Sequence, residues 1–281
     1  MNSAIVKTDS QPIPQVSQSK ISTILILALL GIFFVNSLLF SLTNFDIFPI
    51  ISPSINITCL TLAAFIHGFR RYGIKNLLVF FLISWSLSTF LEATSIHTGF
   101  PFSLYKYVNV PGPRFLDVPF VVGPSCFGMS YVCWMLANLL MGQFGKRLEG
   151  SRKFTIPIIA SFIIVMWDYC LDPIYSTIYS MWVWPNGGSY FGVPIANFAG
   201  WFFYVYIIFQ SFGLYISKYD KQDNKGTSAD FNKGLLFFLF QLSRTDHVEI
   251  YRSMGLAFVM TMLFVIILSC FKLKDIEKIS L

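Results

Sequence analysis

Charge is the scarcest property of this 281-residue sequence, because only 12% of its residues are Asp, Glu, Lys or Arg. Soluble domains carry about 25% charged residues, so this composition cannot supply a soluble surface. Hydrophobic residues make up 55% of the chain, and the mean hydropathy is +0.64. These values exclude a disordered chain, a collagen and a nucleic-acid-binding module. They indicate an integral membrane protein in a lipid bilayer, either the cell membrane or an internal one.

Cysteine and histidine are too few and too scattered for a disulfide framework or a metal centre. The five cysteines are odd in number, and no pair of them has the spacing of metal ligands. We therefore interpret them as small apolar residues of the interior. Three histidines are too few for an iron oxygenase of the histidine-box type. The sequence therefore predicts no metal site.

Long runs of apolar residues make up most of the sequence. A bilayer core of about 30 Å requires about 20 apolar residues per helix. Seven runs of suitable length lie at residues 21–42, 48–69, 76–96, 115–142, 154–175, 193–217 and 254–271. A shorter run at 234–242 is either re-entrant, interfacial or half of an eighth helix. The sequence predicts an all-α, polytopic membrane bundle with seven, alternatively eight, transmembrane helices.

The polar N-terminal residues 1–20 are expected to form a disordered cytoplasmic tail, followed by a single transmembrane domain at 21–281. The first apolar run is too long for a cleavable signal peptide and lacks a small-residue cleavage site. No internal repeat is found, which disfavours an inverted-repeat transporter. The oligomeric state is left open.

Basic residues alternate between the two sides of this layout. They gather in the tail and in the loops after the second, fourth and sixth runs, whereas the loops after the first and fifth runs contain none. The loop after the third run contains only Lys106 and Arg114. Because Lys and Arg mark cytoplasmic loops, the N-terminus is predicted to be cytoplasmic. With seven spans the basic C-terminus would lie outside, which favours eight.

Four carboxylates lie within or at the ends of the apolar runs, where each costs a few kcal/mol and needs a reason. Glu92, Asp117, Asp168 and Asp172 are all placed by this topology near the non-cytoplasmic face. Asp168 and Asp172 share one face of a helix, and Pro173 is expected to kink or end that helix. The pair either supplies a general acid and base or only caps a helix or binds aromatic donors.

Two loops on the same face are unusually aromatic. Residues 97–107 read HTGFPFSLYKY, and residues 181–201 read MWVWPNGGSYFGVPIANFAGW. Their aromatics either form an interfacial belt or line a site. Asn197 would enter the membrane, where an amide needs a partner, so we expect it to hydrogen bond a carboxylate. The candidate substrate-contacting residues are His97, Tyr105, Tyr107, Asp117, Trp167, Trp182, Trp184 and Trp201.

These residues resemble a known family in their order and spacing. Glu92 is followed by TGFPFSLYKY, then by Trp167-Asp168-Tyr169 with Asp172-Pro173, and then by WVW and YFGVPIANFAGW. This pattern resembles the membrane carotenoid biosynthesis proteins of the γ-carotene 1′-hydratase and bisanhydrobacterioruberin hydratase type. The resemblance covers residues 85–215. Ser103 departs from it, since glycine is expected at that position.

The resemblance implies a hydratase that adds water across the terminal C1–C2 double bond of an acyclic (ψ) carotenoid such as lycopene or γ-carotene. The product is a tertiary alcohol, and no cofactor is required. Such a reaction needs an acid, a base and aromatic faces that stabilise a cation. We expect Asp168 or Glu92 to be the acid and Asp172 to orient or deprotonate water. Asn197 would support them by hydrogen bonding.

Other functions remain open. The D-x-x-x-D spacing of Asp168 and Asp172 also occurs in intramembrane polyprenyl transferases, although no second motif is found. A transporter or channel could use the carboxylates for proton coupling. A carotenoid-binding or assembly subunit would bind pigment without chemistry.

Overall fold

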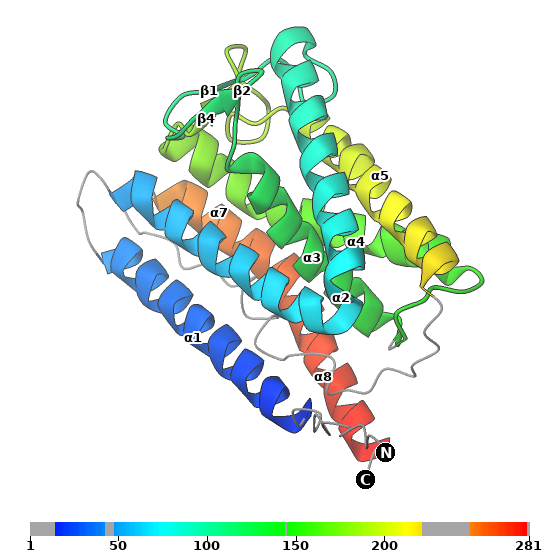
Figure 1. Ribbon diagram of the computed structural model, residues 1–281. Helices are drawn as coiled ribbons and strands as arrows, with labels where there is room; N and C mark the ends of the chain where they lie inside the picture. Colours follow the sequence, from blue (N-terminus) through cyan, green and yellow to red (C-terminus); the bar gives the residue numbers. More distant parts are fainter. Residues whose placement is uncertain (1–14, 43–47, 144, 221–247, 280–281) are drawn as a thin grey trace, which may run out of the picture.

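A computed structural model describes residues 15–42, 48–143, 145–220 and 248–279 as a bundle of helices topped by short paired loops (Figure 1). The helices are α1 (Gln15–Leu42), α2 (Phe48–Thr98), α3 (Val122–Leu140), α4 (Arg152–Asp172), η1 (Pro173–Ile178), α5 (Ile195–Tyr219), α7 (Val248–Phe258), η3 (Val259–Leu263) and α8 (Phe264–Ile279). η1 and η3 are π-helical. The α1 helix begins within the segment expected to be a tail, and the rest of that segment lies outside the described residues.

The predicted all-α architecture is confirmed, but the predicted number of spans is not. Within the described ranges, four helices are long and apolar enough to cross a membrane. They lie within Lys20–Phe40, Ile51–Thr98, Arg152–Ile178 and Ile195–Tyr219. A shorter apolar helix covers Leu256–Lys272. The short run at 234–242 lies outside the described residues.

The α2 helix combines two of the predicted runs, 48–69 and 76–96, into one element of 51 residues. Gly73 separates the two parts, because its φ of 74° and ψ of 167° lie outside the helical region. Glycine adopts such a conformation readily, since it has no Cβ. Figure 1 shows the result as two legs that meet at a sharp bend, with the first leg beside α1. Two of the seven predicted runs are therefore two legs of one bent element.

The predicted run 115–142 is wrong at its start, because α3 begins at Val122. The residues before it form a hairpin in which β2 (Arg114–Phe115) pairs antiparallel with β3 (Val118–Pro119). Leu116 and Asp117 form its two-residue turn with φ values of 51° and 63°, as tight hairpins require. Asp117 therefore does not lie in a transmembrane helix, although its apolar neighbours suggested one.

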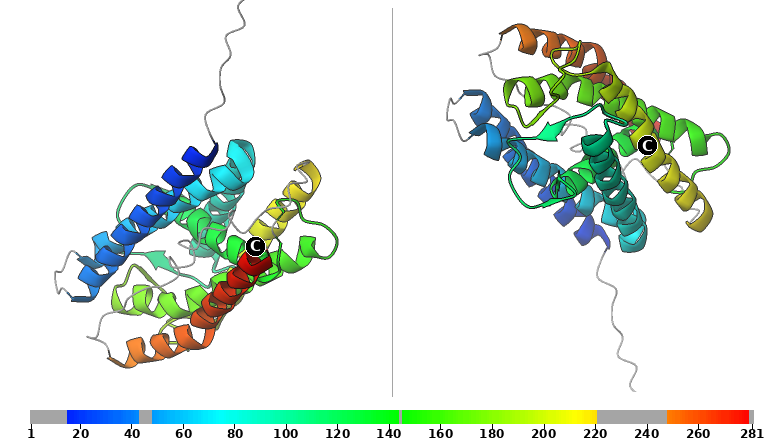
Figure 2. Two further views of the ribbon diagram at one scale, coloured as in Figure 1. Left: turned by 90° about the horizontal axis from the view of Figure 1, so that it is seen from below. Right: turned by 90° about the horizontal axis from the view of Figure 1, so that it is seen from above.

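The two aromatic loops pair with each other, which is consistent with their predicted location on one face. β1 (Lys106–Tyr107) lies antiparallel to β4 (Trp182–Val183), with Tyr107 opposite Trp182. Viewed from above, these loops lie over the middle of the helical bundle (Figure 2). They therefore form a cover over one end of the bundle.

The cytoplasmic location of the N-terminus stays a prediction.

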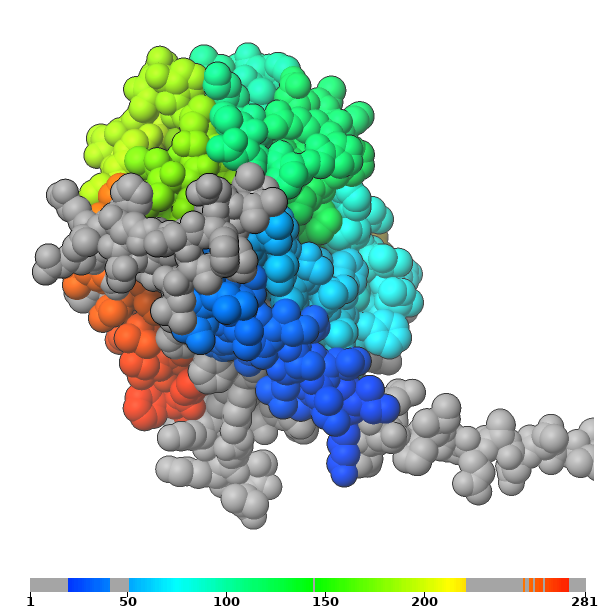
Figure 3. Space-filling model, turned by 90° about the vertical axis from the view of Figure 1, so that its left-hand side faces the viewer, coloured from blue at the N-terminus to red at the C-terminus, as the bar shows by residue number. Residues whose placement is uncertain are grey.

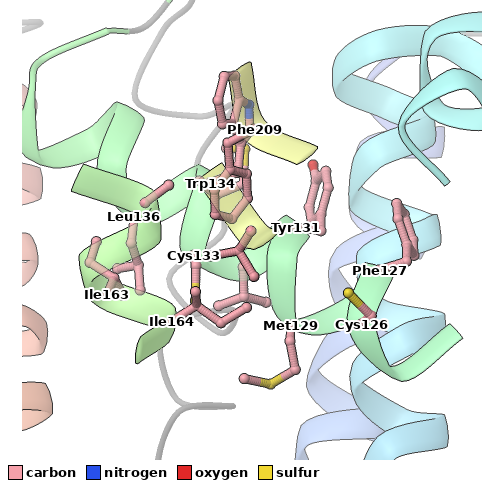
Figure 4. Packing of buried hydrophobic residues seen from close by; sticks show 14 of the residues in the cluster. Cys126, Phe127, Met129, Tyr131, Cys133, Trp134, Leu136, Ile163, Ile164 and Phe209 are labelled. Atoms are coloured by element: carbon pink, nitrogen blue, oxygen red, sulfur yellow. The ribbon is translucent and has the colours of Figure 1, made fainter. Parts of the chain in front are cut away.

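The core of the bundle is aromatic and lies among α2, α3 and α5. The rings of Phe80 and Phe212 stack with centroids 4.2 Å apart, and the Trp134 ring lies 5.9 Å from that of Phe209. Trp134 also donates from its indole nitrogen to the Tyr72 hydroxyl over 2.9 Å. Figure 4 shows Trp134 and Phe209 close together within this packing. This core holds the helices that carry the site.

The outer helix α1 presents apolar side chains to the surroundings. They include Ile21, Ile24, Leu25, Leu27, Ile32, Val35 and Leu38, each at least 45% exposed. Figure 3 shows α1 and the first leg of α2 at the surface of the molecule. A soluble protein does not expose such a continuous apolar face, so it indicates contact with lipid.

The inner side of α1 is joined to α2 by a buried polar cluster. Asn36 donates to the Ser52 hydroxyl over 2.9 Å and to the Asn56 side-chain oxygen over 2.9 Å. Asn56 in turn donates to the Ser37 hydroxyl over 3.0 Å. Polar side chains hydrogen bond across helices in this way in membrane proteins. The cluster therefore fixes α2 against α1.

Candidate active site

A cavity of about 270 Å³ lies between the paired loops and the helices α1 to α5. Its lining residues are Phe33, Pro53, Ser54, Asn56, Ile57, Leu60, Glu92, Phe102, Tyr105, Tyr107, Val110, Pro111, Val121, Val122, Ser125, Cys126, Met129, Ile164, Trp167, Asp168, Leu171, Asp172, Tyr175, Met181, Trp182, Trp184, Asn197 and Trp201. Most of them are apolar or aromatic, with few polar groups. Such a lining is typical of a pocket for an apolar ligand.

Three carboxyl groups from two helices meet in this cavity. Glu92 lies in the second leg of α2, whereas Asp168 and Asp172 lie one turn apart at the end of α4. Each is at most 6% exposed. The lining residues include no Lys, Arg or His. Within the described part of the chain, no group of three or more His, Cys, Asp or Glu is arranged as a metal site.

Asn197 links the two aspartates from the start of α5. Its amide nitrogen donates to Asp172 Oδ2 over 2.5 Å and lies 3.5 Å from Asp168 Oδ2. The hydrogen bond predicted from the sequence is therefore present. Both aspartate side chains therefore approach the same amide nitrogen. Two buried carboxyl groups this close together favour a state in which one of them carries a proton.

Glu92 has a separate partner in the loop that covers the cavity. The Tyr107 hydroxyl donates to Glu92 Oε2 over 2.9 Å. Burial, followed by the neighbouring Glu92 charge, raises the pKa of Tyr107 well above its usual value. The phenol therefore keeps its proton and remains a donor. Because Tyr107 belongs to β1, its pairing with β4 determines where this donor lies.

The end of α4 sets the direction of Asp172. The α-helix ends at this residue, and the π-helix η1 begins at Pro173. The sequence predicted that Pro173 would kink or end the helix, and the α-helix does end there. Ser176 donates to the Asp172 backbone carbonyl over 2.7 Å. Asp168 and Asp172 remain one helical turn apart, so both side chains reach the cavity.

Aromatic side chains form most of the wall around the carboxyl groups. Trp184 donates to the Phe102 carbonyl over 3.0 Å, and the Phe102 ring lies 5.8 Å from that of Trp201. Tyr105 packs at 6.0 Å from the Trp184 ring. Of the twelve candidate residues, ten line the cavity: Glu92, Tyr105, Tyr107, Trp167, Asp168, Asp172, Trp182, Trp184, Asn197 and Trp201.

His97 and Asp117 are not brought to the cavity. His97 Nε2 lies 3.4 Å from Asp117 Oδ2, and the two side chains are 56% and 65% exposed. Neither is a lining residue. Asp117 sits in the turn of the β2–β3 hairpin, where it faces solvent rather than the buried carboxyl groups. Their expected contact with substrate is therefore not supported by the geometry.

Sequence reasoning missed other polar lining residues, notably Asn56 and Cys126. Asn56 belongs to a glycosylation-like triplet within an apolar run, and Cys126 resembles an apolar filler. In the structure Cys126 Sγ lies 2.6 Å from the Tyr204 hydroxyl. Asn56 could have been identified because it is a polar residue within a predicted membrane-spanning run. The same criterion identified the carboxylates.

Residues 53–268 match the model of a family described as carotenoid biosynthesis protein. The match covers most of the chain and every cavity-lining residue except Phe33. The chain belongs to this family. No match was found among curated proteins or among solved structures. This member of the carotenoid biosynthesis protein family therefore has a role in carotenoid biosynthesis, with a carotenoid-like substrate and apolar helices suited to a membrane.

Proposed function

We propose that the protein is a carotenoid hydratase that adds one water across the terminal C1–C2 double bond of an acyclic (ψ) end. The family supports a carotenoid-like substrate. The observation that carries the proposal is the meeting of Glu92, Asp168 and Asp172 in one aromatic cavity. Hydration of an unactivated alkene needs a strong acid and a base, which three buried carboxyl groups can provide.

In the first step, the proton shared by the aspartates is transferred to C2. Asn197 lies 2.5 Å from Asp172 and 3.5 Å from Asp168, so it favours the carboxylate form of Asp172 and leaves the proton on Asp168. The alkene π electrons form the new C2–H bond. A tertiary cation then remains at C1, and Asp168 becomes a carboxylate.

In the second step, the oxygen of water forms a bond to C1 and its proton passes to the aspartate pair. The pair again holds one proton, so the site is restored and the net change is the addition of one water. Glu92, which accepts a hydrogen bond from Tyr107, adds the dipole of a third carboxyl group beside the cation. The faces of Trp167 and Trp201 add cation–π attraction and help to exclude bulk water.

The lining disfavours a polyprenyl transferase. A diphosphate group needs Lys or Arg, and neither occurs among the described residues that line the cavity. A binding protein without chemistry would need no group of three buried carboxyl groups in its cavity, and their position in one aromatic cavity favours chemistry over proton-coupled transport. Hydration is therefore the function that the site supports best.

The test uses membranes that contain the protein, supplied with lycopene or γ-carotene in H₂¹⁸O and a metal chelator. We expect a product heavier by one water, with ¹⁸O in a tertiary hydroxyl group, and undiminished turnover in the chelator. Bound but unaltered pigment would instead indicate a binding protein. A reaction that needs Mg²⁺ and a diphosphate substrate would indicate a prenyl transferase.

A further inference from the structure

Two hydrogen-bond donors in the cavity have no partner among the described residues. They are the indole nitrogen of Trp167 and the hydroxyl group of Tyr105, and both atoms are buried. Tyr105 as a whole is 6% exposed. Leaving such a group unpaired costs about 1–3 kcal/mol, so buried donors nearly always have an acceptor. An acceptor from a bound molecule would satisfy both.

Several other donors in the same cavity have acceptors on the protein. Tyr107 donates to Glu92, Asn197 to Asp172, and Trp184 to the Phe102 carbonyl. The lack of a partner at Trp167 and Tyr105 is therefore not a general property of the cavity. Among the residues that line the cavity, Trp167 and Tyr105 are the two with a buried side-chain donor that has no acceptor among the described residues.

Each unpaired donor stands beside one part of the acid–base machinery. Trp167 directly precedes Asp168 in α4, and both residues line the cavity. The Tyr105 ring packs edge-on, 5.5 Å from the ring of Tyr107, which holds Glu92. An indole N–H can only donate, so its partner must bring an acceptor atom. A water molecule or a hydroxyl group of the ligand would supply such an acceptor.

We propose that Trp167 and Tyr105 form an oxygen subsite that holds the attacking water before the reaction and the C1 hydroxyl oxygen after it. This inference rests on the proposed hydratase function. The subsite binds the oxygen beside C1 while the aspartate pair exchanges the proton. Trp167 and Tyr105 thus determine which oxygen, and which end of the carotenoid, faces the carboxyl groups.

The test compares two unreactive ligands that differ by one oxygen atom. These are an acyclic carotenoid with a saturated 1,2-dihydro end and its 1-hydroxy-1,2-dihydro counterpart, titrated against the full chain in detergent. We expect Trp167→Phe and Tyr105→Phe each to weaken binding of the alcohol about tenfold, and binding of the hydrocarbon less than about twofold. Trp85→Phe is the matched control, because it alters an indole that does not line the cavity. It should leave the ratio of the two affinities unchanged.

An unchanged ratio in both Trp167→Phe and Tyr105→Phe would overturn the subsite. It would mean that the donors serve another molecule, such as a lipid ester. If Trp167→Phe weakens both ligands equally, the ratio measured with Tyr105→Phe decides. A variant that still binds the saturated hydrocarbon is shown by this binding to be folded. This result does not depend on turnover, so the wild-type protein could fail as a hydratase while the affinity ratio still reports the subsite.

Discussion

Replacing Asp168 by asparagine is expected to reduce hydration of the carotenoid end by about 100- to 10,000-fold. The amide keeps the shape of the side chain but cannot supply the proton that C2 requires. Asp172→Asn should have an effect of similar size, because it removes the second carboxyl group at the Asn197 amide, which the proposed mechanism needs to accept the proton of water. Chromatography of the pigments, with mass detection of the hydrated product, measures both effects.

Asp117→Asn is the matched control for these substitutions. Asp117 is an exposed carboxylate outside the cavity, and asparagine also tolerates its φ of 63°. Its turnover should therefore equal that of the wild-type protein. Pigment bound by each variant shows whether the cavity is intact. Hydration at the wild-type rate in both Asp168→Asn and Asp172→Asn would exclude the proposed acid–base pair.

The meeting of Glu92, Asp168 and Asp172 could be predicted from the sequence, because it depends only on how deep each residue lies in the membrane. Glu92 lies near the end of one apolar run and Asp168 near the end of another, and alternating loops place both ends on one face. The i, i+4 spacing of Asp168 and Asp172 then places them together on a helix. None of this requires knowledge of how the helices pack.

The rest of the site depends on contacts that leave little trace in local sequence. β1 and β4 have two residues each and pair across 74 intervening positions, so no periodicity reveals the pairing of Tyr107 with Trp182. Asp117 was misplaced because an apolar hairpin and the start of a membrane helix have the same composition. The contact between α1 and α2 through Asn36 and Asn56 likewise emerges only from the packed structure.

The close approach of α5 to the covering loop predicts the second large effect. An added Cβ on Gly200 would lie 2.6 Å from the Pro101 carbonyl oxygen and 2.8 Å from the Phe102 ring. Since the backbone carbonyl cannot rotate away, α5 or the loop must shift. Gly200→Ala should therefore destabilise the protein by about 1–3 kcal/mol. Gly200 is one turn from Asn197, so the shift also moves the amide away from Asp172, and hydration should fall about 100-fold.

Gly213→Ala, in the same helix, separates this contact from the general effect of alanine. A Cβ on Gly213 would meet its nearest neighbours at 3.5 Å, which is ordinary van der Waals contact. Alanine also favours a helix over glycine by about 1 kcal/mol, so this variant should be at least as stable as the wild-type protein and equally active. Thermal unfolding in detergent and pigment turnover measure both variants. If Gly200→Ala matched Gly213→Ala in both measurements, the contact between α5 and the loop would not position Asn197, and the amide would depend on Asp172 alone.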